Sequence, residues 1–413
     1  MLRLRSLRPN VRRQRRAFPN EAQQLEVRMV PTGVVTLAQT AAGLKITGDV
    51  HNNRVQIDVL SDGATIQAID NDTVIRVGKV NYPAGTVVQL GDSATFLGNL
   101  AIDLKQGDDV LVVNVGEIDD ELPPIIQGAP SISLGDATNA VISGNLSITM
   151  GAGNDDVALI VENGNISIGG NATVDLGSGN DRLLGTPYDD EFFSGGEGGL
   201  GFLEGFFGIG EEFPEDVDTT REVVDLVVNE FGGLKVTGNL NVLAGPGNDG
   251  VGMIGVVAGR DLSVDMGAGE DLFGGAIIGA GRELKLNAGS GHDDALLRLA
   301  YSGSKTTLNM GAGNDVLFAF GVQSTKDVSV NMGAGDDVLL VALLVPGPDA
   351  ITTLDGGSDR DVISDLDFSE GSTFVAPVIA PRTTVKNFES NELFEEVLDQ
   401  LGQDFEELFF RFE

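Results

Sequence analysis

The chain has 413 residues, of which 57 are glycine and 41% are hydrophobic; it has no cysteine or tryptophan, two histidines and a formal net charge of −36. The missing cysteines exclude disulfides, thiolate metal sites and thiol catalysis, and His51 and His292 alone leave little for a zinc site or a Ser-His-Asp triad. The acidity argues against nucleic acid as a partner, and no apolar run reaches the roughly 18 residues of a membrane span, so we expect a folded protein whose counter-ions are cations.

The first residues differ in charge from the rest of the chain. Residues 1–16 hold seven arginines and no acidic residue. Further on, Leu25-Glu26-Val27-Arg28 precedes Pro31 and resembles the LEPR-type segment at the start of large surface proteins of some bacteria. We interpret residues 1–32 as a basic segment that is either a targeting sequence or a disordered tail. An apolar export core is missing, and a tail would neutralise part of the acidic body.

A short motif then recurs along the chain at a fixed period. The string G-x-G-x-D has its first glycine at Gly245, Gly267, Gly289, Gly311 and Gly333, each 22 residues after the last. Earlier copies begin at Gly151 and Gly177, 26 residues apart, and degenerate copies cover residues 107–109 and 357–361. Such a period predicts stacked supersecondary units.

The flanks of the motif show which unit is stacked. Before each glycine, apolar and polar residues alternate, which is typical of strands. Every 22nd residue matches in character, as in the apolar set Val264, Leu286, Leu308 and Val330, with Thr306 as an exception in a neighbouring set. Glycine suits the corners because it reaches positive φ. We therefore predict an all-β parallel β-helix or β-roll solenoid with about 22 residues per turn.

The remaining segments complete the predicted domain organisation. Residues 33–185 are expected to form irregular N-terminal rungs, residues 186–222 a Gly-, Phe- and acid-rich insertion, and residues 223–368 the regular rungs. Residues 369–413 are expected to form a connecting segment and an acidic amphipathic helix. Apolar residues from Leu393 to Phe409 fall at helical spacing, which favours a helix that caps the last rung. A helix that docks to a partner is the alternative.

The corner motif resembles a known calcium-binding repeat. Gly311-Ala-Gly-Asn-Asp315-Val-Leu317 is similar to the RTX nonapeptide G-G-x-G-x-D-x-U-x, which binds calcium in β-rolls. Two departures are the loss of the first glycine and the period of 22 instead of nine, so each turn supplies one corner instead of two. The resemblance implies Ca²⁺ as cofactor, with ligands from Asp155, Asp181, Gly245, Gly247, Asp249, Gly267, Gly269, Asp271, Gly289, Gly291, Asp293, Gly311, Gly313, Asp315, Gly333, Gly335, Asp337 and Asp361.

A physical argument for a cation stands beside the resemblance. Stacked corners place their aspartates in a column with a spacing of roughly 5 Å, where two unit charges repel by about 3 kcal/mol at an effective dielectric of 20. Ca²⁺ suits carboxylate and carbonyl oxygens in flexible geometry, and Mg²⁺ is more demanding. The alternative is that each aspartate only accepts a hydrogen bond from a backbone N–H.

Three classes of function remain open. The first is a non-enzymatic, calcium-stabilised repeat protein of the cell surface or extracellular matrix, with about four to six calcium ions and with surface polysaccharide or other surface proteins as partners. The second is a metal-free structural spacer or adhesin passenger. The third is a carbohydrate-active β-helix enzyme, which the missing tryptophan and three tyrosines disfavour.

Overall fold

The computed structural model describes residues 33–60, 63–91, 95–115, 139–161, 164–187, 224, 233–365 and 382–388. All of them belong to one compact unit, Pro31–Glu413. The LEPR-like segment, most of the predicted insertion and the predicted C-terminal helix lie outside the described residues and stay predictions. Within the described ranges, Val224 is the one helical residue, and no helix is long and apolar enough to cross a membrane.

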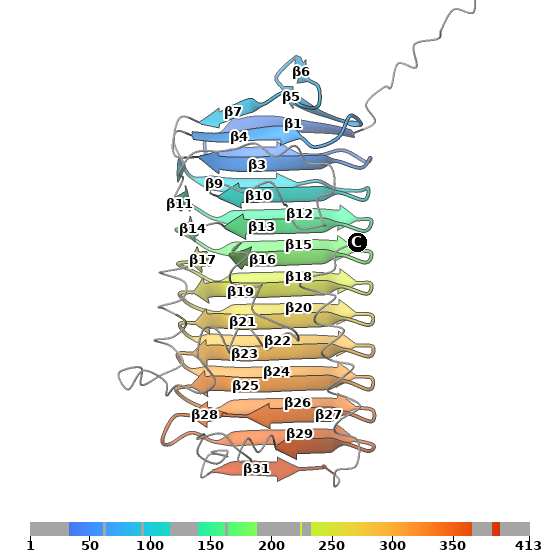
Figure 1. Cartoon of the computed structure of the whole chain (residues 1–413), viewed down its shortest axis with the longest axis vertical. Helices are drawn as coiled ribbons and strands as arrows, with labels where there is room; N and C mark the ends of the chain where they lie inside the picture. Colours follow the sequence, from blue (N-terminus) through green and yellow to red (C-terminus); the bar gives the residue numbers. More distant parts are fainter. Residues whose placement is uncertain are drawn as a thin grey trace, which may run out of the picture. The chain divides into compact units, whose positions relative to one another are not determined.

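The described residues form two large β-sheets (Figure 1). Sheet A contains fourteen strands: β1 (Gly33–Thr40), β2 (Gly43–Thr47), β5 (Thr73–Val77), β6 (Val80–Tyr82), β9 (Asn99–Asp103), β12 (Leu146–Ala152), β15 (Ala172–Ser178), β18 (Leu240–Pro246), β20 (Leu262–Ala268), β22 (Glu283–Ser290), β24 (Lys305–Ala312), β26 (Val328–Ala334), β29 (Thr352–Ser358) and β31 (Thr383–Lys386).

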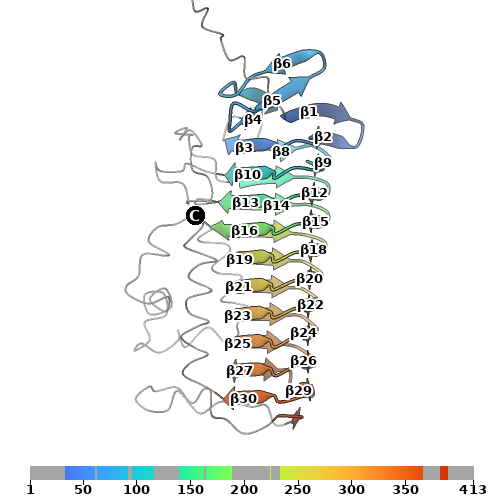
Figure 2. The same ribbon diagram turned by 90° about the vertical axis from the view of Figure 1, so that its right-hand side faces the viewer.

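Sheet B contains seventeen strands and forms the rest of each coil (Figure 2). They are β3 (Arg54–Leu60), β4 (Gly63–Ala68), β7 (Val88–Gly91), β8 (Thr95–Phe96), β10 (Val110–Val115), β11 (Asn139–Ile142), β13 (Asp156–Val161), β14 (Asn165–Ile168), β16 (Arg182–Pro187), β17 (Gly233–Val236), β19 (Gly250–Ala258), β21 (Leu272–Ala280), β23 (Asp294–Ser302), β25 (Val316–Ser324), β27 (Val338–Ala342), β28 (Val345–Pro346) and β30 (Val362–Asp365).

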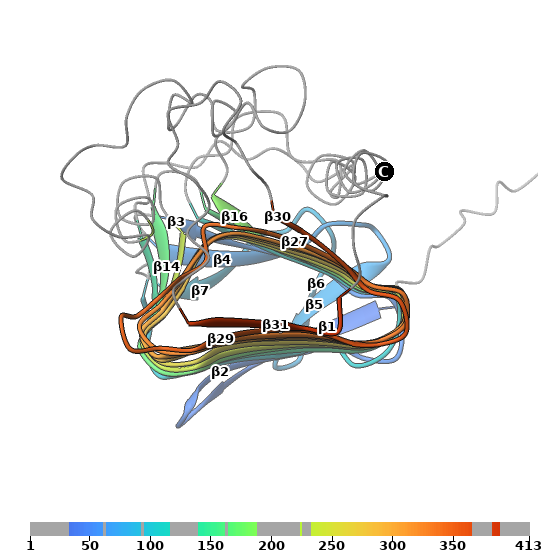
Figure 3. The same cartoon turned by 90° about the horizontal axis from the view of Figure 1, so that it is seen from below.

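Successive coils stack in parallel with the register that the repeat predicts. Leu262 of β20 pairs with Leu284 of β22, and Leu284 pairs with Thr306 of β24, 22 residues further on each time. Seen along the stack, the coils superimpose, with sheet A on one side and sheet B on the other (Figure 3). The predicted all-β parallel solenoid is therefore confirmed.

The N-terminal end departs from this pattern. The pairs β1–β2, β3–β4, β4–β7 and β5–β6 are antiparallel, so this end is built of hairpins and not only of irregular parallel rungs. The G-x-G-x-D motif does not occur in these residues, and the period of the motif therefore does not predict the hairpins.

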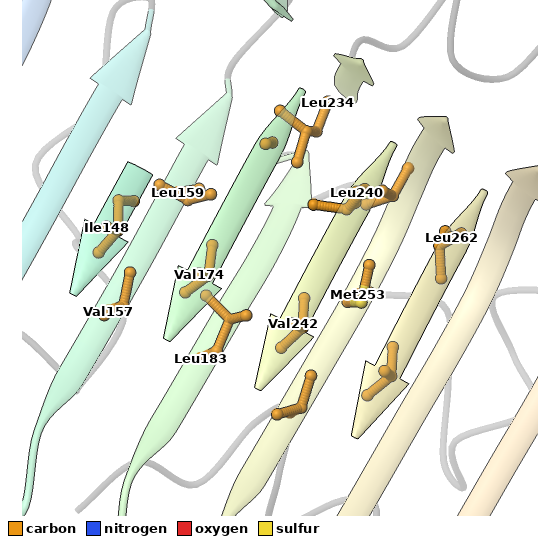
Figure 4. Packing of buried hydrophobic residues seen from close by; sticks show 14 of the residues in the cluster. Ile148, Val157, Leu159, Val174, Leu183, Leu234, Leu240, Val242, Met253 and Leu262 are labelled. Atoms are coloured by element: carbon orange, nitrogen blue, oxygen red, sulfur yellow. The ribbon is translucent and has the colours of Figure 1, made fainter. Parts of the chain in front are cut away.

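The core lies between the two sheets (Figure 4). Inward-facing residues such as Val264 and Leu308 are at most 1% exposed. Thr306, which broke the apolar set, is also buried, and its hydroxyl lies 2.8 Å from that of Ser302, which in turn donates to Ser324. The polar side chain is tolerated because its hydrogen bonds are satisfied.

Three corners join the sides of each coil. The Gly–Asp corner, the G-x-G-x-D segment after each sheet A strand, leads into sheet B. Sheet B then bends at a residue with positive φ, which we call the αL corner: Gly255, Ile277, Leu299, Gly321 and Leu343, with φ of 53–65°. The Asn corner leads back to sheet A, where a side-chain oxygen of one coil accepts from the backbone N–H of the next, as between Asn145 and Asn171 (2.8 Å).

The long interval between Asp181 and Asp249 contains one coil boundary and no extra rung. The N–H of Asp181 donates directly to Asp249 Oδ1, 68 residues away, and β16 pairs with β19. β16 ends at Pro187 and β17 begins at Gly233. In β17, Leu234 pairs with Val256, which directly follows Gly255 of the αL corner. The residues between β16 and β17 are therefore inserted at the αL corner.

Candidate metal centre

Stacking forces glycine at two positions of the Gly–Asp corner. Gly267 and Gly269 have φ of 103° and 151°, and a Cβ on either would overlap the carbonyl oxygen of the equivalent glycine one coil earlier, Gly245 or Gly247. The same overlap occurs at the equivalent glycines of the other regular corners. The glycines therefore let neighbouring coils approach closely, and they align their carbonyl groups in two columns along the stack.

The motif aspartates form a buried column. Their exposed fraction is 0–3%, so they do not extend into water from the edge of the solenoid. The column contains nine residues: Asp109, Asp155, Asp181, Asp249, Asp271, Asp293, Asp315, Asp337 and Asp361. All predicted aspartates lie in it, and Asp109 is an additional member that the prediction did not include.

Each aspartate is tied to the coil before it through one carboxylate oxygen. The backbone N–H of one aspartate donates to Oδ1 of the next, and eight such hydrogen bonds of 2.7–3.1 Å link the column. The backbone hydrogen bond considered as an alternative to a metal is therefore present, but it runs between coils and not within one turn.

The second oxygen of these carboxylates has no such anchor. In eight of the coils, Oδ2 is buried and has no hydrogen-bond partner: Asp109, Asp155, Asp181, Asp249, Asp271, Asp293, Asp315 and Asp337. Buried polar atoms are nearly always paired in proteins, and one unpaired carboxylate oxygen repeated at the same place in successive coils indicates a missing partner.

Burial also raises the pKa of these carboxyl groups, because apolar surroundings disfavour the charged form. The pKa of Asp109, Asp181, Asp271 and Asp315 is raised to about 7, and that of Asp155 and Asp337 to about 6. Hydrogen bonds from the neighbouring backbone oppose this rise, and the charges of neighbouring aspartates add to it.

A second column runs beside the first on the exposed side and was not predicted. It consists of the residue before each column aspartate, such as Asn154, Asn180 and Asn314. Here the backbone N–H of one coil donates to the side chain of the coil before it, at 2.8–3.0 Å. In the aspartate column, the N–H donates instead to the side chain of the coil after it. His292 takes part through Nδ1, which accepts from the N–H of Asn314 at 2.8 Å. The frequent asparagine before the aspartate was the available sequence signal.

Both columns end where the motif degenerates. At the N-terminal end, Asn53 occupies the aspartate position and its N–H donates to Asp109 Oδ1 at 2.6 Å. Lys105 and Asp359 replace corner glycines next to Asp109 and Asp361, and both keep a positive φ of 79° and 82°.

The donor set of the aspartate column consists of oxygen atoms, which suits a hard cation. Within the described ranges, no three His, Asp or Glu side chains converge on one point. A cation in the column would therefore have to combine carboxylates of two coils with backbone carbonyls, a donor mixture that Ca²⁺ accepts.

Comparisons with known proteins add little. No family model matches the chain, and no curated protein is similar to it. A crystal structure of a hyperactive, Ca²⁺-dependent, β-helical antifreeze protein from an Antarctic bacterium is 21% identical, covers 66% of this chain and 81% of its own, and has a TM-score of 0.22. At that TM-score, the likeness has no weight for this chain.

Proposed function

We propose that this chain is a non-enzymatic repeat protein that binds Ca²⁺ along the aspartate column and is stabilised by it. The observation that supports this proposal is the buried, unpartnered Oδ2 atom at the same position of eight coils. No family resemblance is needed for the argument.

The column needs neutralisation from some source. Two carboxylates one coil apart, at roughly 4.8 Å, repel by about 3 kcal/mol at an effective dielectric of 20, and each has also lost its hydration. Protons can neutralise the column below a pH of about 7, given the raised pKa values. At higher pH, a divalent cation between successive coils is the remaining way to keep the charges buried.

The residues that would hold the ion are the column aspartates, through Oδ2, together with carbonyl groups of the corner glycines. Bound Ca²⁺ would supply positive charge and link one coil to the next. The column offers eight intervals between its nine aspartates, so eight ions is the upper limit, above the four to six expected from the sequence.

A role outside the cell, at the cell surface or in the matrix, fits such sites. A ligand that binds only the folded state stabilises it in proportion to the logarithm of its concentration, and weak calcium sites therefore fill only where calcium is abundant. Surface polysaccharide or other surface proteins stay our proposal for partners.

A metal-free spacer is the second candidate, and the Oδ1 hydrogen bonds favour it. In that case, the column would be a set of neutral carboxyl groups whose only role is to accept hydrogen bonds from backbone N–H groups. The two candidates predict opposite effects of Asp271→Asn, which removes the charge and keeps an oxygen acceptor for the N–H of Asp249.

The experiment is equilibrium dialysis of the purified chain against calcium at pH 8, paired with urea unfolding in excess calcium and in chelator. Binding of several ions per chain and a large rise in the free energy of unfolding with calcium support the proposal. Asp271→Asn should then bind fewer ions and be less stable in calcium. Zero bound calcium, with Asp271→Asn more stable than the wild type at pH 8, would establish the spacer.

A further inference from the structure

The outer face of sheet B is apolar and largely buried, although no strand of the described ranges lies on that side of it. Six outward-facing side chains there are 0–5% exposed: Val112 of β10, Ala158 and Ile160 of β13, Leu184 of β16, Ile254 of β19 and Leu340 of β27. Between β19 and β27, the outward side chains of Leu296 and Phe318 are half-buried. None belongs to the core cluster between the sheets. By contrast, the outward side chains of sheet A, such as Asp265 and Asn287, are exposed or half-buried. An outward side chain is buried to this extent only when another layer packs on the sheet.

A cation that has no ion-pair partner among the described residues lies in the middle of this face. Arg298 of β23 is half-buried, and its Nε is buried without a hydrogen-bond partner. Its guanidinium carbon lies 5.9 Å from the ring centre of Phe320, which is stacked on Phe318. Loss of hydration lowers the pKa of Arg298 to about 10. A buried guanidinium usually has a carboxylate partner, so the layer that covers this face should be acidic as well as apolar.

We propose that the C-terminal sequence 391–413 of the same chain packs on the outer face of sheet B, across the parts of β19 to β27 between the Gly–Asp corner and the αL corner, and places a carboxylate at Arg298. Beyond the αL corner, Val224 lies beside Gly279 of β21. This sequence holds eight acidic residues and one arginine, and it carries apolar residues at helical spacing from Leu393 to Phe409. Its predicted helix presents an apolar side to Leu296 and Phe318 and acidic residues at the borders of that side.

Length and chain position agree with this occupant. Seventeen helical residues span about 25 Å, and five strands at roughly 4.8 Å spacing cover about 20 Å. The last described strand, β31, pairs with β29 at the end of sheet A and ends at Lys386, and Phe388 packs against the core cluster, so the C-terminal sequence begins at the C-terminal end of the stack. This placement differs from a helix that closes the last rung, and it does not depend on calcium.

The absence of cysteine allows a direct test by cross-linking in the full-length protein. Leu401→Cys is combined with Leu296→Cys on the outer face of sheet B, or with Ser329→Cys on the outer face of sheet A as the matched control. A short bis-maleimide should join Cys pairs within one chain for Leu296 and not for Ser329. Cross-linked dimers would show that a second copy covers the face, and equal cross-linking of both pairs, or none of either, would also overturn the proposal.

A protection measurement gives an independent readout. In the single variant Leu296→Cys, the thiol should react with maleimide at least tenfold faster after residues 391–413 are deleted, while the far-ultraviolet circular dichroism spectrum keeps its strand signal and loses only the contribution of the deleted helix. Arg298→Glu should accelerate the reaction in the full-length chain, and Arg298→Lys should not. An unchanged rate on deletion, in a protein that keeps its strand content, assigns the cover to another segment and refutes the inference.

Discussion

Asp293 Oδ1 lies 3.0 Å from the backbone nitrogen of Asp271, which belongs to the coil before it. The two oxygens of this carboxylate therefore have different roles. One oxygen fixes the register between two coils, and the other is buried without a partner and is available to a cation. Replacements that remove one role and keep the other can separate them.

Asp315→Ala removes both roles at one coil. The N–H of Asp293 loses its acceptor, which is expected to lower the free energy of unfolding by about 1–3 kcal/mol even without calcium. In excess calcium, the loss should be larger, because an interval of the column also loses a ligand. Urea unfolding in both conditions measures the difference. Asp349→Ala, whose side chain is 98% exposed, is the control and should change little; equal losses with and without calcium would speak against a bound ion at Asp315.

The pH dependence of stability should change sign with calcium. The column carboxyl groups have a raised pKa in the fold, up to about 7, against 3.8 for an ordinary aspartate. The metal-free fold therefore binds more protons than the unfolded chain, and it should lose stability as pH rises from about 4 to 7 and then level off. In calcium, stability should instead rise across pH 6–8, because ligands must lose their protons. Thermal unfolding at pH 5, 6, 7 and 8 tests both; parallel curves with and without calcium contradict the proposal.

Gly269→Ala should be strongly destabilising. Its φ is 151°, and the added Cβ would overlap the carbonyl oxygen of Gly247, so we expect a loss of about 3 kcal/mol or more in the free energy of unfolding. Gly85→Ala is the matched control, because Gly85 also has a positive φ of 71° but no atom within 4 Å of an added Cβ. Backbone strain alone should make it lose about 1 kcal/mol. Similar losses for both would mean that the coils are not closely stacked at Gly269.

His292→Ala should destabilise the fold more than His292→Asn. His292 Nδ1 accepts from the N–H of Asn314, and alanine removes this acceptor. Asparagine, which occupies this position in several other coils, keeps a side-chain acceptor. The measurement is the free energy of unfolding in urea, where we expect the alanine variant to lose about 1 kcal/mol relative to the asparagine variant. Equal stability of the two variants would rule out this role of Nδ1.

Much of the solenoid could be predicted from the period of the sequence. A repeat of 22 residues determines which residues pair, and the pairing of Leu262 with Leu284 and Thr306 follows from it. The N-terminal hairpins could not be predicted in this way, since the motif does not occur in β3, β4 and β7, which pair antiparallel. The full motif does not identify Asp109, because Lys105 stands where the motif requires its first glycine.

The candidate site was predictable in position but not in orientation. The spacing of Asp249, Asp271 and Asp293 predicts a column, and the column exists. The burial of the carboxylates depends on the turn conformation and on the neighbouring coil. So does the difference between Oδ1, which accepts a backbone hydrogen bond, and Oδ2, which has no partner. A single turn does not contain the amide that binds Oδ1, so local sequence rules could describe only a hydrogen bond within the turn.

The αL corner has a practical consequence for protein engineering. At the other two corners, side-chain oxygens accept hydrogen bonds from the backbone of the neighbouring coil. The αL corner instead consists of a single residue with positive φ, such as Gly255 or Leu343. At this corner, the chain already accommodates 45 residues between Pro187 and Gly233. We therefore expect foreign peptides to be tolerated best when they are inserted beside Gly321 or Leu343. A loop at these positions can be lengthened without loss of the hydrogen bonds at the Gly–Asp corner or the Asn corner.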